Sequence, residues 1–166
     1  MLEKNSKDFV WRSTNKMDSI YQNACIQRYK NLLPGDKYGH PGVYSITVNG
    51  EIVYIGKARD MASRVAYHLF KIVEGEWSSP AEQFKYGELR KVKNFGYDIN
   101  FNVLYASVLT GEEEKKIIDD DIGPQEAYYI NKYLPKLNKQ IPCLDNYHKY
   151  KTKKYETLDT LLKGCV

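Results

Sequence analysis

Five side chains that could handle a phosphate group lie within a stretch of 25 residues. Tyr44 and Tyr54 each stand in a short strand-like run that contains a glycine, and Lys57 follows the second run directly. Arg64 and His68 come next, four residues apart in a helix-like segment. Tyrosine can position or deprotonate a water, whereas lysine, arginine and histidine can neutralise phosphate oxygens or exchange protons with them. The combination is what a phosphate-handling site needs.

Each of these residues also has an ordinary structural interpretation. Tyrosine is common in strands, so packing is the better interpretation of Tyr44 or Tyr54 taken alone, and Lys57 taken alone is best interpreted as a solvated lysine. Arg64 and His68 form a stronger signal, because the i, i+4 spacing puts both on one helical face. Arg64 could clamp a phosphate with its planar fork, and His68 could act as a general acid or base or donate a hydrogen bond.

Hydrolysis of a phosphodiester also requires charge stabilisation at phosphorus, which a divalent metal held by a carboxylate commonly supplies. Asp119, Asp120 and Asp121 are consecutive, so they point around a helix, and we interpret them as a solvated face. Glu126 is the better candidate, because it lies in the first turn of a helix after Pro124 whose other residues are apolar enough to dock on a sheet. One carboxylate with waters suits Mg²⁺, which keeps much of its hydration.

The two tyrosines belong to a predicted β-hairpin, with strands over residues 43–48 and 51–56 and an Asn-Gly turn between them. A two-residue loop would put the tyrosines on opposite faces of the sheet. A three-residue loop, in which Gly50 is left-handed, would place Tyr44 directly across from Tyr54. We expect the three-residue loop, because the tyrosines could share one site in that register.

Further predicted elements surround the hairpin. Helical periodicity predicts helices over residues 18–33, 58–73, 80–93 and 125–133, and alternation predicts a third strand over residues 98–109. Ser79 and Pro80 are expected to begin the third of these helices as its cap and first residue. A short acidic helix starting at Thr110 is expected to break at Gly123-Pro124.

Length and composition narrow the class of protein. The 166 residues suit one domain over 1–166, with an N-terminal extension over 1–40, a core over 41–138 and a basic tail over 139–166. The net charge of +4 permits nucleic-acid binding without arguing for it. The first residues lack the apolar core of a signal peptide, no apolar run is long enough for a membrane span, and the three cysteines show no pairing or metal spacing, so we expect a cytoplasmic protein.

Lysine alternates with tyrosine in the tail, which suits contacts to a DNA backbone and equally suits a frayed terminus. Basic residues also gather on the helices predicted over 58–73 and 80–93. The candidate DNA-contacting residues are Lys71, Lys85, Arg90, Lys91, Lys93, Lys149, Lys151, Lys153 and Lys154.

The run Gly42-Val43-Tyr44 followed by Tyr54-Ile55-Gly56-Lys57 resembles the signature of the GIY-YIG nuclease superfamily. The later positions of the family pattern match Arg64, His68, Glu126 and Asn138, the last of these in a Pro-x-x-Asn ending. Either half of the signature alone is weak, but the full set in order over residues 42–138 is strong.

The resemblance implies an α+β fold, with a small three-stranded antiparallel sheet flanked by helices, an N-terminal helical extension and a basic C-terminal tail. It implies one divalent metal, Mg²⁺ or Mn²⁺, held by Glu126. Tyr44 would be the general base or the group that positions the water, and Arg64 and Lys57 would stabilise the phosphate. The resemblance further implies that Tyr54 and His68 assist and that Asn138 supports the site.

Among the relatives, the length and central motif look most like a stand-alone type II restriction endonuclease. Such an enzyme would cut double-stranded DNA as a homodimer and would have a cognate methyltransferase as its partner. Two alternatives are a nuclease of repair, mobile-element or effector type and a non-catalytic DNA-binding protein on the same scaffold. The presence of Glu126 and Arg64 argues against the non-catalytic alternative.

Overall fold

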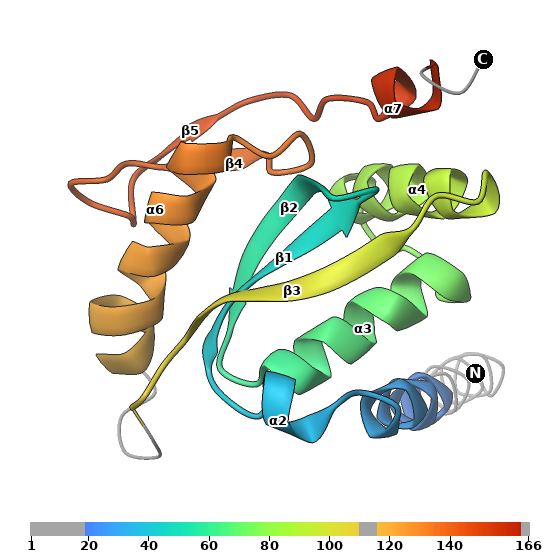
Figure 1. Ribbon diagram of the computed structural model, residues 1–166, viewed down its shortest axis with the longest axis horizontal. Coiled ribbons are helices and arrows are strands. Elements are labelled where there is room, and N and C mark those ends of the chain that lie inside the picture. Colours follow the sequence, from blue (N-terminus) through green and yellow to red (C-terminus); the bar gives the residue numbers. More distant parts are fainter. Residues whose placement is uncertain (1–18, 110–115, 164–166) are drawn as a thin grey trace, which may run out of the picture.

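The computed structural model of the protein describes residues 19–109 and 116–163. Its centre is an antiparallel sheet in the order β2-β1-β3, formed by β1 (Gly42–Val48), β2 (Glu51–Ala58) and β3 (Ile99–Ala106). Figure 1 shows helices α3 and α4 on one side of this sheet and α6 on the other. The predicted α+β class and its three-stranded antiparallel sheet are therefore confirmed.

The predicted loop of the β1–β2 hairpin is wrong, although the tyrosines still meet on one face. Val48 pairs with Glu51, so the loop has two residues, and both Asn49 (φ 49°) and Gly50 (φ 84°) are left-handed. This conformation matches the right-handed twist of the flanking strands, which is why an Asn-Gly pair closes the hairpin without a third residue. The predicted left-handed Gly50 is confirmed.

A β-bulge restores the alignment that the two-residue loop would have lost. Thr47 pairs with Ile52 and Ile46 pairs with Tyr54, so that Val53 is an extra residue on β2. The extra residue changes the side of the sheet to which every later residue of β2 points. Tyr54 therefore lies across from Ile46 on the face that carries Tyr44, and is not directly across from Tyr44 as predicted.

One face of the sheet packs against α3 (Met61–Val73) and α4 (Pro80–Asn94). Asp60 caps α3 by accepting a 2.9 Å hydrogen bond from the Ser63 backbone N–H, so α3 begins three residues after the predicted start, beyond the end of β2. The start of α4 agrees with the prediction, with Ser79 as cap and Pro80 first. These two helices bury the apolar side chains of β1 and β2 that point toward them.

The opposite face packs against a continuous helical segment, the π-helix η1 (Ile117–Ile122) followed directly by α6 (Gly123–Tyr133). The predicted break at Gly123-Pro124 is therefore wrong. Proline has no N–H, and the first turn of a helix does not require one. Pro124 is therefore accommodated at the start of α6, where the π-helix ends. The start of the predicted acidic helix, from Thr110, lies outside the described residues. Helix α6 ends at left-handed Leu134 (φ 44°), before Pro135.

The segments outside the central sheet and its flanking helices also form regular secondary structure. Residues 19–31 form a helix, in agreement with the prediction, and the short helix α2 (Gly35–Tyr38) follows. The predicted basic tail contains a two-stranded ladder, β4 (Gln140–Pro142) with β5 (Tyr150–Thr152), and then α7 (Asp159–Lys163). In Figure 1 this C-terminal segment runs from α6 across to α4. No helix within the described residues combines the length and apolar character needed to cross a membrane.

Candidate active site

Tyr44 of β1 and Tyr54 of β2 lie side by side on the sheet face that α3 and α4 cover. Their ring centroids are 6.4 Å apart and their planes are tilted by 45°. Tyr44 is only 2% exposed, whereas Tyr54 is half-buried and lines a cavity. The bulge at Val53 thus brings both tyrosines to one place, with Tyr54 on the open side and Tyr44 beneath it.

Gly56 leaves the space that the Tyr44 hydroxyl occupies. The two residues pair across the strands, and a Cβ atom built on Gly56 would lie 2.5 Å from Tyr44 Oη and 2.7 Å from Cζ. Real Cβ atoms do not approach other atoms so closely, so any larger residue at this position displaces the tyrosine ring. The glycine of the second motif therefore has a packing reason, which is the fit of the tyrosine from the first.

His68 of α3 joins Tyr44 to Tyr86 of α4 in a buried hydrogen-bonded chain. The His68 Nε2 atom lies 2.6 Å from Tyr44 Oη, and the Nδ1 atom lies 2.8 Å from Tyr86 Oη. A neutral imidazole has one N–H and one lone pair, so one hydroxyl donates to the ring and the other accepts from it. Both ring nitrogens are satisfied, as burial in a core requires.

Burial holds this chain of groups in its neutral form. It raises the pKa of Tyr44 well above the usual value, and the positive charge of Arg64 opposes this only in part. It also lowers the pKa of His68 well below 6.5, and the charges of Lys85 and Arg64 act in the same direction. At neutral pH Tyr44 therefore keeps its proton, and His68 is an uncharged imidazole whose protonated form is disfavoured by burial.

Glu126 and Lys57 form the charged part of the site at the edge of the sheet. Lys57 Nζ donates to Glu126 Oε2 at 2.5 Å, which joins the end of β2 to the first turn of α6. Burial raises the pKa of Glu126, and the Lys57 ammonium offsets this only in part. The ion pair with Lys57 therefore offsets only part of the cost of burying the Glu126 carboxylate.

Asn138 fixes the chain that follows α6 along the free edge of β2. Its Oδ1 accepts from the Ile55 N–H at 2.9 Å, and its Nδ2 donates to the Ile55 carbonyl at 2.8 Å. The Leu137 N–H adds a 2.9 Å hydrogen bond to the Val53 carbonyl beside the bulge. Since Ile55 lies between Tyr54 and Gly56, Asn138 holds the tyrosine strand in place without being a candidate for chemistry.

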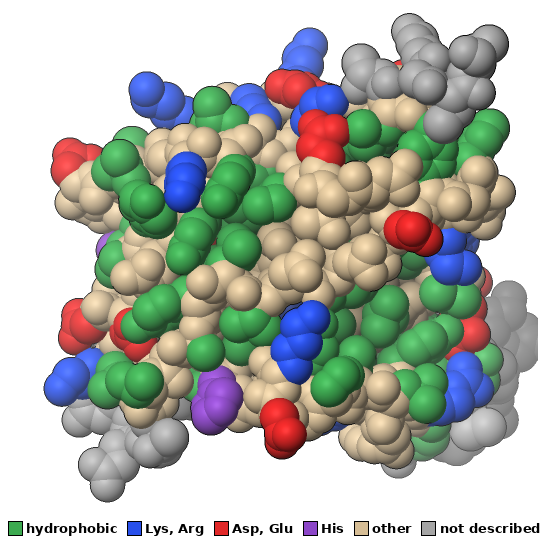
Figure 2. All heavy atoms as spheres, viewed as in Figure 1, with side chains coloured by type: hydrophobic (Ala, Val, Ile, Leu, Met, Phe, Trp, Pro, Cys, Tyr) green, Lys and Arg blue, Asp and Glu red, His purple; other side chains and the backbone are tan. Residues whose placement is uncertain are grey.

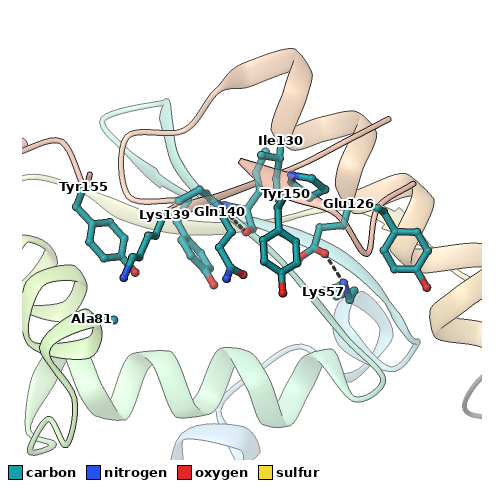
Figure 3. A pocket seen from close by; sticks show the side chains of 13 residues that line it. Lys57, Ala81, Glu126, Ile130, Lys139, Gln140, Tyr150 and Tyr155 are labelled. Carbon is teal, nitrogen blue, oxygen red and sulfur yellow. Dashed lines mark hydrogen bonds and ion pairs between the residues drawn. The ribbon is translucent and has the colours of Figure 1, made fainter. Parts of the chain in front are cut away.

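A cavity of about 440 Å³ connects the charged edge with the tyrosines. Tyr54, Lys57, Glu126 and Asn138 line it, together with residues of the C-terminal segment. In Figure 3 the Lys57–Glu126 ion pair lies at one end of the cavity and Ala81 of α4 lies toward the other. The side chains of the C-terminal segment that face the cavity include Lys139, Gln140, Tyr150 and Tyr155.

Arg64 lies beside the cavity and does not line it. It is exposed on the first half of α3, one helical turn before His68, and its guanidinium has no hydrogen bond or ion pair with the residues that the structure describes. Its charge acts on both Tyr44 and Tyr54, against the larger effect of burial. An unpaired guanidinium next to tyrosine hydroxyls is able to bind an anion.

Three of the predicted DNA-contacting residues have structural roles instead. Lys71 is buried and donates to the Glu76 carbonyl at 2.5 Å. Arg90 donates to the carbonyls of Ile72, Lys71 and Gly75 at the end of α3, and Lys91 pairs with Asp159 at 2.7 Å. These side chains are occupied by the fold, because the C-terminal carbonyls of a helix need donors.

The remaining basic candidates differ in their surroundings. Lys93, Lys149, Lys151 and Lys154 are exposed, whereas Lys153 donates to the Pro135 carbonyl at 3.0 Å. Figure 2 shows that lysine and arginine side chains are scattered over the face it presents and do not form one basic patch. The charge on this face gives no single direction from which DNA would approach.

Several residues near the site were missed in the sequence. Tyr86 is one of them, because its spacing with Leu89 and Val92 indicates an apolar helix face and gives no sign of a histidine partner. Tyr147 is another, since its ring lies 5.4 Å from Lys57 Nζ. The alternation of lysine and tyrosine in the tail was the one signal for the aromatic lining of the cavity.

The acidic run at 119–121 is only partly the solvated face that was predicted. Asp120 is exposed, but Asp119 accepts a 2.7 Å hydrogen bond from the Tyr147 hydroxyl and Asp121 accepts from Tyr105 and Ser107. These carboxylates do not converge, as expected for consecutive residues of a helix.

The residues present fit one hydrated divalent cation. No group of three or more histidine, cysteine, aspartate or glutamate side chains occurs among the described residues, so a closed cage of protein ligands is not formed there. Glu126 nevertheless faces the cavity of about 440 Å³, and its ion pair with Lys57 compensates only part of the cost of burying its carboxylate. Mg²⁺ is commonly bound in this way, through one or two carboxylates, several waters and the phosphate of a substrate.

No protein-family model and no curated protein matches the chain. Among solved structures it is similar to the GIY-YIG N-terminal endonuclease domain of UvrC from Thermotoga maritima, bound to its catalytic divalent cation. A tyrosine-to-phenylalanine mutant of that domain shares 22% identity over 68% of this chain and 93% of that one, with a TM-score of 0.38. An asparagine-to-alanine mutant shares 20% identity over the same fractions, with a TM-score of 0.37. Likenesses this distant leave the activity of the chain to be argued from its own residues.

Proposed function

We propose that this protein is a metal-dependent endonuclease of the GIY-YIG superfamily that hydrolyses phosphodiester bonds of DNA. The observation that carries the proposal is the convergence of the motif residues. Tyr54, Lys57, Glu126 and Asn138 come from β2, α6 and the chain after α6, yet they line one cavity. Tyr44 and His68 lie directly behind Tyr54, with ring centroids 6.4 Å and 5.8 Å from it.

The proton chemistry is assigned to the buried chain. Tyr54 faces the cavity and would position the attacking water, whereas neutral His68 would be a transient acceptor of the proton, because burial disfavours its charged form. Tyr44 connects them, because its hydroxyl lies 2.6 Å from His68 Nε2 and can pass a proton to the ring as it takes one from the cavity side. In the hydrolysis a bond forms between the water oxygen and phosphorus, the phosphorus–oxygen bond to the leaving group breaks, and the departing oxygen takes a proton from water.

The charge chemistry is assigned to the edge of the sheet and to α3. Glu126 would hold the divalent cation, Mg²⁺ or Mn²⁺, which when bound supplies charge neutralisation at the phosphate. Lys57 would turn from Glu126 to a phosphate oxygen once the carboxylate has a stronger cation. Arg64 would contact the same phosphate through its free guanidinium, and Asn138 would keep β2 in position.

Within this proposal, the role of a type II restriction endonuclease that cuts double-stranded DNA as a homodimer is the finer hypothesis. A cognate methyltransferase would then protect the host DNA. A repair, mobile-element or effector nuclease is the alternative within the superfamily. The fragments separate these roles, because a restriction enzyme yields discrete products, whereas a smear or a preference for branched DNA favours the alternative.

The decisive experiment uses plasmid DNA with Mg²⁺ or Mn²⁺ and three proteins, the wild type, Glu126→Ala and Asp120→Ala. Asp120 is a matched control, since it is an exposed carboxylate on the neighbouring η1. We expect the wild type and Asp120→Ala to cut, and Glu126→Ala to lose cutting by about 1,000-fold while it still binds DNA. A wild type that cuts no DNA with either metal, or a Glu126→Ala variant that cuts normally, would overturn the proposal.

A further inference from the structure

Lys85 of α4 carries a half-buried ammonium group that the fold does not neutralise. Its Nζ lies 4.4 Å from the ring centroid of Tyr54 and 4.8 Å from that of Tyr86. Among the described residues, its ammonium has no hydrogen-bond or ion-pair partner. A lysine removed from water normally acquires an anion or acceptor, because unpaired burial of charge is costly. Contacts with two aromatic faces replace only part of the lost hydration.

The nearest acidic residue does not serve as that partner. Glu82 lies one turn earlier on α4, but its Oε1 accepts from the Tyr67 hydroxyl at 2.7 Å. Its Oε2 accepts from the N–H and the hydroxyl of Ser78 at 3.0 Å and 2.9 Å. Lys91 on the same helix shows the usual arrangement, since it pairs with Asp159 at 2.7 Å. Lys85 is therefore half-buried without the acidic partner that Lys91 has among the described residues.

Lys85 shares its surroundings with a second unpaired cation, Arg64 of α3. Burial lowers the pKa of Lys85 to about 8, Glu82 opposes this, and the charge of Arg64 adds to the lowering. Both cations also lower the pKa of His68, after the larger effect of burial. Two like charges that repel each other are stabilised together when an anion binds to both.

We infer that Lys85 is a ligand of the substrate phosphate and that it holds, with Arg64, the phosphate group that is placed at Tyr54. This inference rests on the proposed nuclease function and adds a cation that the sequence motif does not contain. The planar guanidinium of Arg64 can contact the two non-bridging oxygens of a phosphodiester, and the ammonium of Lys85 supplies a further positive point charge beside them. Lys85 thereby neutralises charge from the α4 side, opposite to Glu126 and Lys57.

This role of Lys85 predicts that DNA cutting depends on pH in a distinctive way, because the Lys85 amine has to be protonated to bind the phosphate. Lys85 interacts through charge with Arg64 and His68 of α3 and with Glu82 of α4, and its ammonium contacts the rings of Tyr54 and Tyr86. Tyr67 of α3 is the hydrogen-bond partner of Glu82. Burial first of all raises the pKa of Tyr67 to about 12, raises those of Tyr54 and Tyr86, and lowers that of His68. Lys85 is the member of this set that loses its charge near pH 8, and arginine in its place would stay charged.

The first experiment compares kcat/KM for DNA cutting by Lys85→Met, Lys85→Arg and Lys132→Met between pH 6.5 and 9.5. Lys132 is a matched control, since it lies over two tyrosine rings of α6, at 5.8 Å and 5.2 Å, but is exposed. We expect Lys85→Met to lose about 100-fold, the usual effect of removing one group that stabilises transition-state charge, and Lys132→Met to change less than threefold. The wild-type value should fall tenfold per pH unit above about pH 8, and Lys85→Arg should not show this fall.

Cutting by Lys85→Met within threefold of the wild type would overturn the inference. An alkaline fall that persists in Lys85→Arg would overturn it as well. Neither result touches the proposed function, which fails if the wild type cuts no DNA or if Glu126→Ala cuts normally.

The second experiment does not depend on cutting. Reductive methylation of the wild type at pH 8, with and without a short DNA oligonucleotide in Ca²⁺, is followed by peptide mass spectrometry. We expect DNA to slow the labelling of Lys85 at least fivefold, to leave Lys132 unchanged, and to protect Lys85 less in the Arg64→Met variant. Equal labelling of Lys85 with and without DNA, in protein that binds the oligonucleotide, would show that no phosphate reaches it.

Discussion

The two parts of the candidate site differ in how they treat charge. On the α3–α4 face, Tyr44, His68 and Tyr86 are buried, neutral and joined by hydrogen bonds of 2.6 Å and 2.8 Å. At the β2 edge, Lys57 and Glu126 are ionised partners that open onto a cavity. The buried part is therefore suited to positioning groups and passing a proton. The charged edge is suited to exchanging one cation for another.

The difference follows from how each part is packed. The buried part needs every hydrogen-bonding atom paired, so any displacement of a ring breaks a chain of contacts. The edge needs only that opposite charges remain near each other, and water can replace a lost contact. Substitutions in the buried part should therefore affect stability and activity together, whereas substitutions at the edge should affect activity or DNA binding with little change in stability.

The largest combined effect is expected for Gly56→Ala. The added methyl group would lie 2.5 Å from Tyr44 Oη, so the ring must move away from His68. We expect a loss of about 1–3 kcal/mol in the free energy of unfolding, typical of overpacking a core, and at least a 100-fold loss of cutting through misplacement. Chemical denaturation and plasmid cleavage measure the two quantities.

Gly50→Ala is the matched control for this substitution. Gly50 is left-handed (φ 84°), but no atom lies within 4 Å of an added Cβ. Its replacement should cost about 1 kcal/mol through backbone strain and should leave cutting by the folded protein unchanged. Equal activities of Gly56→Ala and the wild type would mean that the Tyr44 hydroxyl has no part in the reaction.

A second prediction concerns the pH dependence of stability, in which the two parts have opposite signs. His68 has a folded pKa well below 6.5, so the unfolded chain binds more protons and stability is lost as the pH falls below 6.5. Glu126 has a folded pKa above 4.5, so its contribution is lost as the pH rises from 4.5 through that folded pKa. The limiting slope for one proton is about 1.4 kcal/mol per pH unit.

The variants His68→Gln and Glu126→Gln separate these contributions in urea unfolding between pH 4.5 and 7.5. His68→Gln should flatten the rise of stability with pH, and Glu126→Gln should make it steeper. His40→Gln, a substitution of an exposed histidine, should leave the wild-type curve in place. A His68→Gln curve parallel to the wild type would contradict a neutral, buried His68.

The sequence predicted the elements of the fold better than the register that aligns the site. Strong local signals were sufficient for the hairpin, for the Ser79-Pro80 helix start and for the helix that contains Glu126. The bulge was not predictable from turn chemistry, although Ile52 and Val53 break the apolar–polar alternation of β2 and give a signal in retrospect. The partners Tyr86 and Lys85 come from α4, and no local pattern determines which side chains of one helix meet those of another.

Residue types alone also predicted more basic side chains to be available for DNA than the structure leaves available. Lys71, Arg90 and Lys91 were predicted to contact DNA, but the fold uses their charges to hold the end of α3 and the segment around Asp159. A long basic side chain satisfies carbonyl groups as readily as phosphates, and only the packing of α3 against α4 decides between them.

The smallest expected effect is that of the tail on DNA affinity, because exposed lysines contact phosphates without positioning them. Lys149, Lys151 and Lys154 are exposed on the C-terminal segment, whereas Lys153 is tied to the Pro135 carbonyl. In a triple alanine variant of the three exposed residues, the slope of log Kd against log salt should fall by up to about 0.9 per lost phosphate contact. The cleavage rate at saturating DNA should stay within twofold of the wild type, since the charged edge at Glu126 is untouched. A large loss of that rate with an unchanged salt slope would instead place the tail within the reacting site. The charged edge and the buried part would then no longer account for the reaction by themselves.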